Sequence, residues 1–130
     1  MDIVIDTSAL LAVILGEPER DRIVKLTAGC ALLGPGSIPW EIGNAFSAML
    51  KQRRLEFSEA QQGISLFQNI PLRLVKVDLN NALSIAHQTN MYAYDAYFLD
   101  CSLRHAAPLL TLDRALERAA RKIGVKLLEV

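Results

Sequence analysis

Short apolar runs alternate with longer amphipathic stretches along the whole chain. The runs are rich in Ile, Val and Leu, as is typical of strands buried in a parallel sheet, and they lie at residues 3–5, 31–33, 72–77, 108–111 and 125–128. The stretches between them predict helices at residues 9–15, 19–28, 39–53, 58–70, 78–90, 92–105 and 114–123. Strands that alternate with helices in this way predict a parallel α/β domain.

Capping and turn residues indicate where several of these elements begin. Ser37, followed by Pro39, predicts a helix start, because serine is a good N-cap and proline fits the first turn. Ser58 and Gln61 have the spacing of a capping box. The run at 72–77 alternates too little for a half-exposed strand, so we expect the third strand to be buried.

The first strand is followed directly by an acid, Asp6, and by two hydroxyl residues, Thr7 and Ser8. Ligands of an open parallel sheet bind at the carboxyl ends of its strands, which is where Asp6 lies. Aspartate is also a common N-cap. On this segment alone, a helix cap and a functional acid are equally good interpretations of Asp6.

The composition is that of a globular protein. Hydrophobic residues make up 52% of the 130 residues and charged residues 22%, which excludes a disordered chain and predicts one domain over residues 1–130. No apolar run approaches the roughly 20 residues that cross a bilayer, and the N-terminus lacks the basic region of a signal peptide. Cys30 and Cys101 have no metal-type spacing, so we expect reduced core thiols in a cytoplasmic protein.

Four acids fall where a parallel sheet would bring them together. Two of them follow strands and two lie near the starts of helices, and they are Asp6, Asp113, Glu41 and Asp95. Two unit charges about 4 Å apart repel by about 4 kcal/mol at an effective dielectric constant near 20, so such a cluster needs a neutralising cation. An all-carboxylate site favours Mg²⁺ or Mn²⁺ over zinc. The pattern therefore predicts a metal-dependent nuclease or phosphohydrolase.

The bases offer a possible nucleic-acid surface. The net charge is zero, with 14 Lys and Arg residues against 14 Asp and Glu residues. If the four acids bind metal, ten other acids remain against those 14 bases. One face of the last predicted helix carries several bases, namely Arg114, Arg118, Arg121 and Lys122. We expect Arg114 and Arg118 to contact an RNA backbone, and a solvated helix face explains the same pattern equally well.

Other side chains have a weaker connection to this chemistry. Asn44 shares a helix face with Glu41 and either binds water or phosphate or caps a local backbone group. Asp100 lies about 140° around the helix from Asp95, so we expect it to pair with a surface base. One stripe is more typical of a core or a subunit interface than of a base-stacking platform, and it consists of Trp40, Phe46 and Met49.

Four motifs together resemble those of the PIN-domain family, in particular the VapC-type ribonuclease toxins of prokaryotic toxin–antitoxin modules. The motifs are VIDTSAL at 4–10, WEIGNA at 40–45, YDAYFLD at 94–100 and TLDRAL at 111–116. The resemblance implies a three-layer α/β/α sandwich whose five-stranded parallel sheet has the order 3-2-1-4-5. It also implies a metal-binding acidic pocket made by Asp6, Glu41, Asp95 and Asp113, with supporting polar side chains from Ser8, Asn44 and Thr111.

The same resemblance implies a Mg²⁺- or Mn²⁺-dependent endoribonuclease that binds RNA and is held by a small VapB-like antitoxin. The high apolar content suggests exposed apolar surface, and we expect a homodimer. One alternative is a catalytically silent PIN-fold interaction module, against which the retention of all four acids counts. A receiver-like phosphoacceptor domain is a weaker alternative, because Thr7 and not a second acid follows Asp6 and no lysine follows the last strand.

Overall fold

A parallel sheet with helices on both of its faces organises the protein. The structure is a computed structural model that describes all 130 residues. Every strand pairing is parallel, and the sheet has the order β3-β2-β1-β4, with β1 at Asp2–Ile5, β2 at Ala31–Pro35, β3 at Leu72–Val75 and β4 at Leu109–Leu110. The predicted α/β class and the order of these four strands are confirmed.

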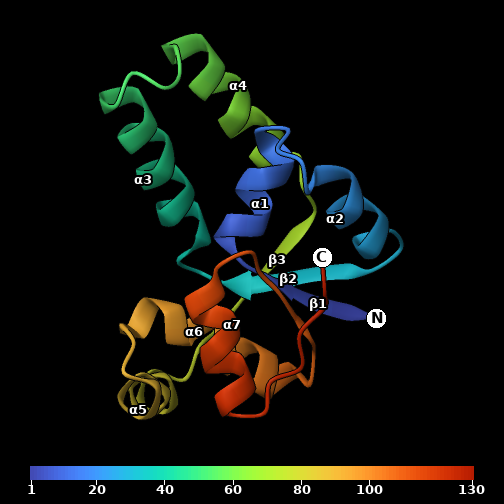
Figure 1. The fold of residues 1–130 in the computed structure, drawn as a ribbon, viewed down its shortest axis with the longest axis vertical. Helices are drawn as coiled ribbons and strands as arrows, with labels where there is room; N and C mark the ends of the chain where they lie inside the picture. Colours follow the sequence, from blue (N-terminus) through green and yellow to red (C-terminus); the bar gives the residue numbers. More distant parts are fainter.

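Helices form a layer on each side of the sheet (Figure 1). One layer contains α1 (Thr7–Ile14), α2 (Arg20–Thr27), α3 (Ile38–Lys51) and α4 (Phe57–Gln68). The other contains α5 (Leu79–Thr89), α6 (Ala93–His105) and α7 (Arg114–Lys122). This is the three-layer sandwich that the resemblance implies.

The fifth strand that we expect at residues 125–128 does not form. This segment makes one isolated parallel bridge, between Leu109 and Leu127. Leu109 N donates to Lys126 O at 2.9 Å, and Leu128 N donates to Leu109 O at 2.9 Å. The physical reason is the length of β4, because a neighbour of only two residues offers too few backbone groups for a longer ladder. The five-stranded sheet is therefore corrected to four strands and a bridge.

Two other local predictions are wrong. The third strand is not buried, because β3 is an edge strand that pairs only with β2 and leaves Arg73 and Leu74 exposed. The capping box is not at Ser58, because α4 begins at Phe57. There, Glu56 N donates to Glu59 Oε1 at 2.9 Å, which is the capping arrangement two residues earlier in the chain.

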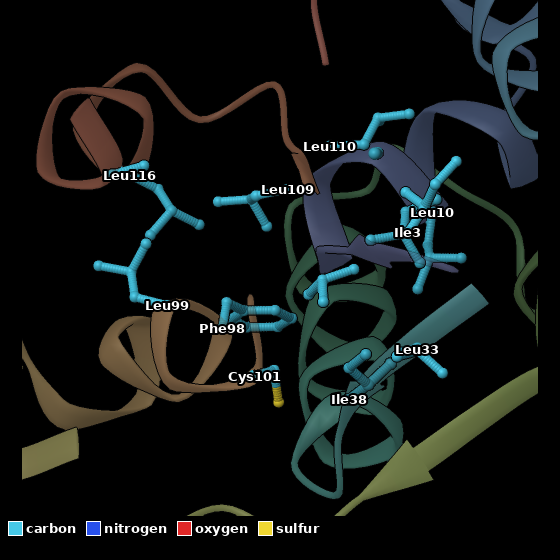
Figure 2. Packing of buried hydrophobic residues seen from close by; sticks show 14 of the residues in the cluster. Ile3, Leu10, Leu33, Ile38, Phe98, Leu99, Cys101, Leu109, Leu110 and Leu116 are labelled. Atoms are coloured by element: carbon cyan, nitrogen blue, oxygen red, sulfur yellow. The ribbon is translucent and has the colours of Figure 1, made fainter. Parts of the chain in front are cut away.

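The buried apolar side chains form one cluster that spans the sheet and both helix layers. Successive residues of β4 point to opposite faces of the sheet, as in any strand. Figure 2 shows Leu109 on the side of Leu99 and Leu116, and Leu110 on the side of Leu10. Figure 1 shows the carboxyl ends of β1 and β2 leading directly into α1 and α3, and this edge of the sheet is where Asp6 lies.

The predicted stripe on α3 is divided between core and surface. Phe46 and Met49 are buried as expected, whereas Trp40 is 73% exposed because it lies on the other side of α3, about 180° around the helix from Met49. Cys30 is half-buried and Cys101 is buried, and both are free thiols. Burial raises the pKa of Cys101 to about 12, as expected of a core residue. None of the helices has the length and apolarity needed to cross a membrane.

Candidate functional site

Asp6 is a buried carboxylate held at the carboxyl end of β1. Its side chain is 4% exposed and accepts three hydrogen bonds, from Ser8 Oγ at 2.7 Å, Ala9 N at 3.1 Å and Thr111 Oγ1 at 2.5 Å. The bond from Ala9 N makes Asp6 the N-cap of α1. The bond from Thr111 comes from the far end of the chain, so the capping role alone does not account for this environment.

Burial raises the pKa of Asp6 from 3.8 to about 6. The hydrogen bonds from Thr111, Ser8 and Ala9 act in the opposite direction, because each stabilises the ionised form. The negative charge of Asp113 raises the pKa further. The Asp6 carboxyl group therefore loses its proton near pH 6 and not near pH 4.

Two hydroxyl groups connect the segments after β1 and β4. Thr111 Oγ1 donates to Asp6 and accepts from Asp113 N at 3.0 Å. Ser8 Oγ accepts from Leu112 N at 2.9 Å and lies 3.4 Å from Thr111 Oγ1. Asp6 N also donates to Leu110 O at 3.1 Å. These bonds fix Asp113 relative to Asp6, although 107 positions separate the two in the sequence.

Glu41 joins the same site through hydroxyl groups that the sequence pattern did not identify. Thr7 Oγ1 donates to Glu41 Oε1 at 2.9 Å, and Ser37 Oγ donates to Glu41 Oε2 at 2.7 Å. Ser37 stands at the predicted start of α3, but its side chain makes no capping bond and binds the acid one turn later. The spacing of Ser37 and Glu41 on one helix face is the signal that could have indicated this pair.

Asp95 lies in the first turn of α6 and is connected to the other acids by charge. Burial raises the pKa of Asp95 from 3.8 to about 6, and the charges of Asp113 and Glu41 raise it further. The same three acids raise the pKa of the neighbouring Tyr94 hydroxyl, with Asp95 making the largest contribution. The carboxylates from α3, α6 and the segment before α7 therefore lie within electrostatic reach of one another.

No base of the chain neutralises these four acids. Every ion pair in the structure involves other carboxylates, namely Asp2, Asp78, Asp100, Glu117 and Glu129. The only hydrogen bonds to the Asp113 carboxylate come from Ala115 N and Leu116 N, because Asp113 is the N-cap of α7. Asp95 receives no side-chain hydrogen bond. The site thus combines several carboxylates with no internal counter-charge.

The donor chemistry fits a hard divalent cation. No three of the chain's His, Cys, Asp and Glu side chains lie close enough together to coordinate one ion between them. Mg²⁺ prefers oxygen ligands, keeps several of its waters and is often held by only one or two direct carboxylates. The carboxylates at this edge are the residues that could hold such an ion, in part through water.

Asn44 and Asp100 lie outside the side-chain hydrogen bonds of the four acids. Asn44 is exposed on α3 and makes no side-chain bond to Glu41. Asp100 pairs with an exposed base as expected, with 3.6 Å between its Oδ2 and Arg104 Nε, and is itself only 1% exposed. Its other bonds come from Asp78 N at 3.1 Å and Asn81 Nδ2 at 2.6 Å. Asp100 thus connects α6 to the start of α5, away from the acids described above.

The predicted basic face of α7 is only partly free. Arg121 pairs with Glu117 at 3.8 Å and with Glu129 at 3.4 Å, and Lys122 Nζ donates to Gln88 O at 3.1 Å. Arg114 and Arg118 are exposed and form no ion pair. Arg114 follows Asp113 directly, so the two unpaired arginines extend from the acidic site along α7.

The sequence profile of the PIN domain matches residues 3–122. The chain belongs to the PIN-domain family. All four motifs on which the resemblance depends lie inside the matched region, so this prediction is confirmed. No curated protein sequence matches the chain.

Solved structures share the PIN fold at low sequence identity. PAE2754 from Pyrobaculum aerophilum superposes with a TM-score of 0.73 at 22% identity, over 92% of this chain and 79% of the other. VapBC2 from Rickettsia felis, bound to a DNA fragment from its promoter, gives 0.68 at 13% identity, over 98% of both chains. The sarcin-ricin loop cleaving toxin VapC20 from Mycobacterium tuberculosis gives 0.65 at 14% identity, over 98% of both chains. At these identities the likeness establishes the fold of this PIN domain.

Proposed function

We propose that this PIN domain is a Mg²⁺- or Mn²⁺-dependent endoribonuclease and the toxin of a VapBC-type toxin–antitoxin module. Asp6, Glu41, Asp95 and Asp113 would hold the metal, in part through its waters, and perform the chemistry, and Ser8 and Thr111 would orient Asp6. The observation that supports this function best is the set of carboxylates from four segments, connected at one edge of the sheet without a base among them. The likeness to the Mycobacterium tuberculosis toxin is consistent with it.

Asp6 and Asp95 would have different roles in this reaction. A divalent ion bound to these carboxylates would supply Lewis-acid stabilisation of a phosphate and lower the pKa of a water. Asp6, with three hydrogen bonds, is fixed in orientation and suited to a binding role. Asp95 has no side-chain partner and a pKa of about 6. It is suited to accept a proton from an attacking water near neutral pH.

Cleavage of RNA by the purified protein tests the proposal. We expect cleavage with Mn²⁺ or Mg²⁺, loss of cleavage in EDTA, and a fall of at least about 100-fold in Asp6→Asn, because a bound metal supplies several kcal/mol of transition-state stabilisation. Asp21→Asn is the matched control, because it makes the same change at an exposed position on α2 whose side chain forms no hydrogen bond or ion pair with a site residue. Cleavage by Asp6→Asn at the wild-type rate would contradict the proposal.

Arg114 and Arg118 are proposed to hold the RNA backbone next to the acids. The double variant Arg114→Ala/Arg118→Ala should bind RNA more weakly and lower the magnitude of the slope of log K against log salt by about 2, since each lost phosphate contact removes nearly one unit. Arg20→Ala/Arg22→Ala on exposed α2 positions is the matched control. If the slope of log K against log salt is the same for the two double variants, Arg114 and Arg118 do not contact RNA and only form a solvent-exposed face of α7.

A homodimer and a small VapB-like antitoxin are proposed as partners. Solved structures that share the fold include VapBC2 and a toxin–antitoxin complex from Klebsiella pneumoniae, and the unneutralised acids would accept a basic side chain. Apolar residues exposed on α5, including Leu79 and Leu83, support self-association. Light scattering at micromolar concentration should give a dimer mass, and the product of an adjacent small gene should inhibit cleavage. A monomer and the absence of such a gene would remove both proposals.

A further inference from the structure

Exposed aromatic side chains gather beside the acids of the site. The chain has one tryptophan, three tyrosines and four phenylalanines, of which Trp40, Phe57, Tyr92 and Tyr94 are more than half exposed. Three of these four lie within three positions of a site acid, since Trp40 precedes Glu41 and both tyrosines shortly precede Asp95. Exposed large apolar groups at one place on a surface mark a binding site more often than a structural one.

Tyr92 and Tyr94 form a ready-made flat surface at the start of α6. Their ring centroids are 6.2 Å apart and their planes differ by 13°. Tyr92 is the N-cap residue of α6, and its carbonyl accepts from Asp95 N at 3.2 Å and Ala96 N at 3.4 Å. Both rings are thus carried by a hydrogen-bonded helix start, while Tyr92 is 77% exposed and Tyr94 51%.

The tyrosine pair lies at the acids and not elsewhere on the protein. The hydroxyl of Tyr94 is within reach of the charges of Asp95, Glu41 and Asp113, which come from three different segments. Two exposed groups near the pair are polar or charged, namely Asn90, two positions before Tyr92, and Asp113, whose charge acts on the Tyr94 hydroxyl. An aromatic area of two rings with such neighbours is much smaller than the roughly 800 Å² that each partner buries in a standard protein interface.

We propose that Tyr92 and Tyr94 stack an unpaired RNA base next to the phosphate at which cleavage occurs. This inference rests on the proposed ribonuclease function and deepens it. A base is planar and uncharged, so it can approach the acids where a phosphate without a cation cannot, and stacking on aromatic side chains is the usual way in which proteins hold single-stranded nucleic acid. The substrate class is therefore single-stranded or looped RNA, because bases within a duplex are already stacked on one another.

A short single-stranded RNA that contains 2-aminopurine tests the platform, because stacking on an aromatic ring quenches the fluorescence of this base. Binding is measured with Ca²⁺ in place of Mg²⁺, so that a cation lets the phosphates approach the acids, and a gel of the same samples shows that the RNA is uncut. We expect quenching with the wild type and with Tyr92→Phe/Tyr94→Phe, which keeps the rings. We expect no quenching and an affinity about 5- to 150-fold weaker with Tyr92→Leu/Tyr94→Leu, which keeps apolar volume but removes the rings.

Phe57→Leu is the matched control, because Phe57 is an exposed aromatic residue at the start of α4, far from α6 (Figure 1). Equal affinity and quenching in the wild type and the Leu double variant overturn the platform. A Leu double variant that changes only the mass in light scattering, and not RNA binding, also overturns it and assigns the rings to a contact between two copies. Metal-dependent cleavage by the wild type, measured separately, shows whether the nuclease function itself stands, so the two failures are distinguishable.

Discussion

Opposing influences act on a single carboxylate at Asp6. Burial raises its pKa, three hydrogen bonds lower it, and the result is about 6. A carboxylate that is ionised in this environment is less stable than the same group in the unfolded chain, because the desolvation exceeds what the hydrogen bonds return. The residue most central to the site is therefore also a source of instability, which a bound cation would relieve.

The pH dependence of stability should report this residue. Because the folded-state pKa is raised, the folded protein binds the proton of Asp6 more tightly than the unfolded chain does. The stability that this group contributes is present at low pH and is lost as pH rises from about 4 to about 6. Between pH 4 and pH 7.5 in EDTA, Asp6→Asn should gain roughly 2–3 kcal/mol relative to the wild type in urea unfolding. The free energy of unfolding of Asp21→Asn should depend on pH as that of the wild type does. If the curve of Asp6→Asn against pH also runs parallel to that of the wild type, the raised pKa of Asp6 is contradicted.

Thr111→Val tests the hydroxyl that connects Asp6 to Asp113. The change removes one donor to Asp6 and one acceptor for Asp113 N at nearly constant volume. It should lower the free energy of unfolding by about 1–3 kcal/mol at pH 8. The loss should be smaller at pH 5, where Asp6 is protonated. Thr89→Val, which removes only a local bond to Ile85 O, should show the same loss at both pH values. If the loss of stability in Thr111→Val is the same at both pH values, the Thr111 hydroxyl does not stabilise the ionised form of Asp6.

At the scale of elements, helices α3 and α4 run in roughly opposite directions in Figure 1. They pack closely against each other at one glycine, Gly63. A Cβ at Gly63 of α4 would overlap the ring of Phe46 on α3. Gly43 is also within a helix, but it is exposed and nothing lies near the position of a Cβ there. Alanine raises the helix propensity equally at both positions. Any difference in stability between Gly43→Ala and Gly63→Ala therefore reports the packing of α4 against α3.

The two alanine variants should change stability in opposite directions. Gly43→Ala should raise the free energy of unfolding by roughly 0.5–1 kcal/mol. Gly63→Ala should lower it by roughly 1–3 kcal/mol, because the overlap with Phe46 exceeds the gain in propensity. Urea unfolding of both variants measures the difference. If Gly63→Ala stabilises the protein, then α3 and α4 can move apart without lowering the free energy of unfolding.

At the scale of the whole molecule, a net charge of zero conceals an uneven distribution. The four acids at the sheet edge form no ion pair, whereas Asp2, Asp78, Asp100, Glu117 and Glu129 pair with arginines. Four of the carboxylates without an ion pair thus meet at one edge, next to the unpaired Arg114 and Arg118. Repulsion within this edge acts against folding until a cation binds.

Mg²⁺ or Mn²⁺ should therefore stabilise the folded protein. A ligand that binds only the folded state at 100 times its Kd adds about 2.7 kcal/mol, which for a chain of this size corresponds to a rise in Tm of roughly 10 °C. Sodium chloride at equal ionic strength controls for screening, and Asp95→Asn should reduce the response. If sodium and magnesium act equally, the edge does not bind a divalent ion.

The sequence by itself determined the parts of this protein that depend on local pattern. Apolar runs and caps predicted β1, β2 and all seven helices within a few residues, because periodicity and capping act over a single turn or strand. Asp6 and Asp113 could be placed beside each other because both follow strands of a parallel sheet, whose carboxyl ends share one edge. The four motifs were sufficient to predict the PIN-domain family.

Only the tertiary structure decided which distant groups meet. The bond of Thr7 to Glu41 depends on how α3 packs beside α1, which no local pattern contains. The segment at 125–128 has the composition of a strand but makes one bridge, because its neighbour β4 has only two residues. The stacking of Tyr92 on Tyr94 at the acids likewise depends on the placement of α6. Side-chain contacts across the fold are set by packing between elements, and packing involves residues that are remote in the sequence.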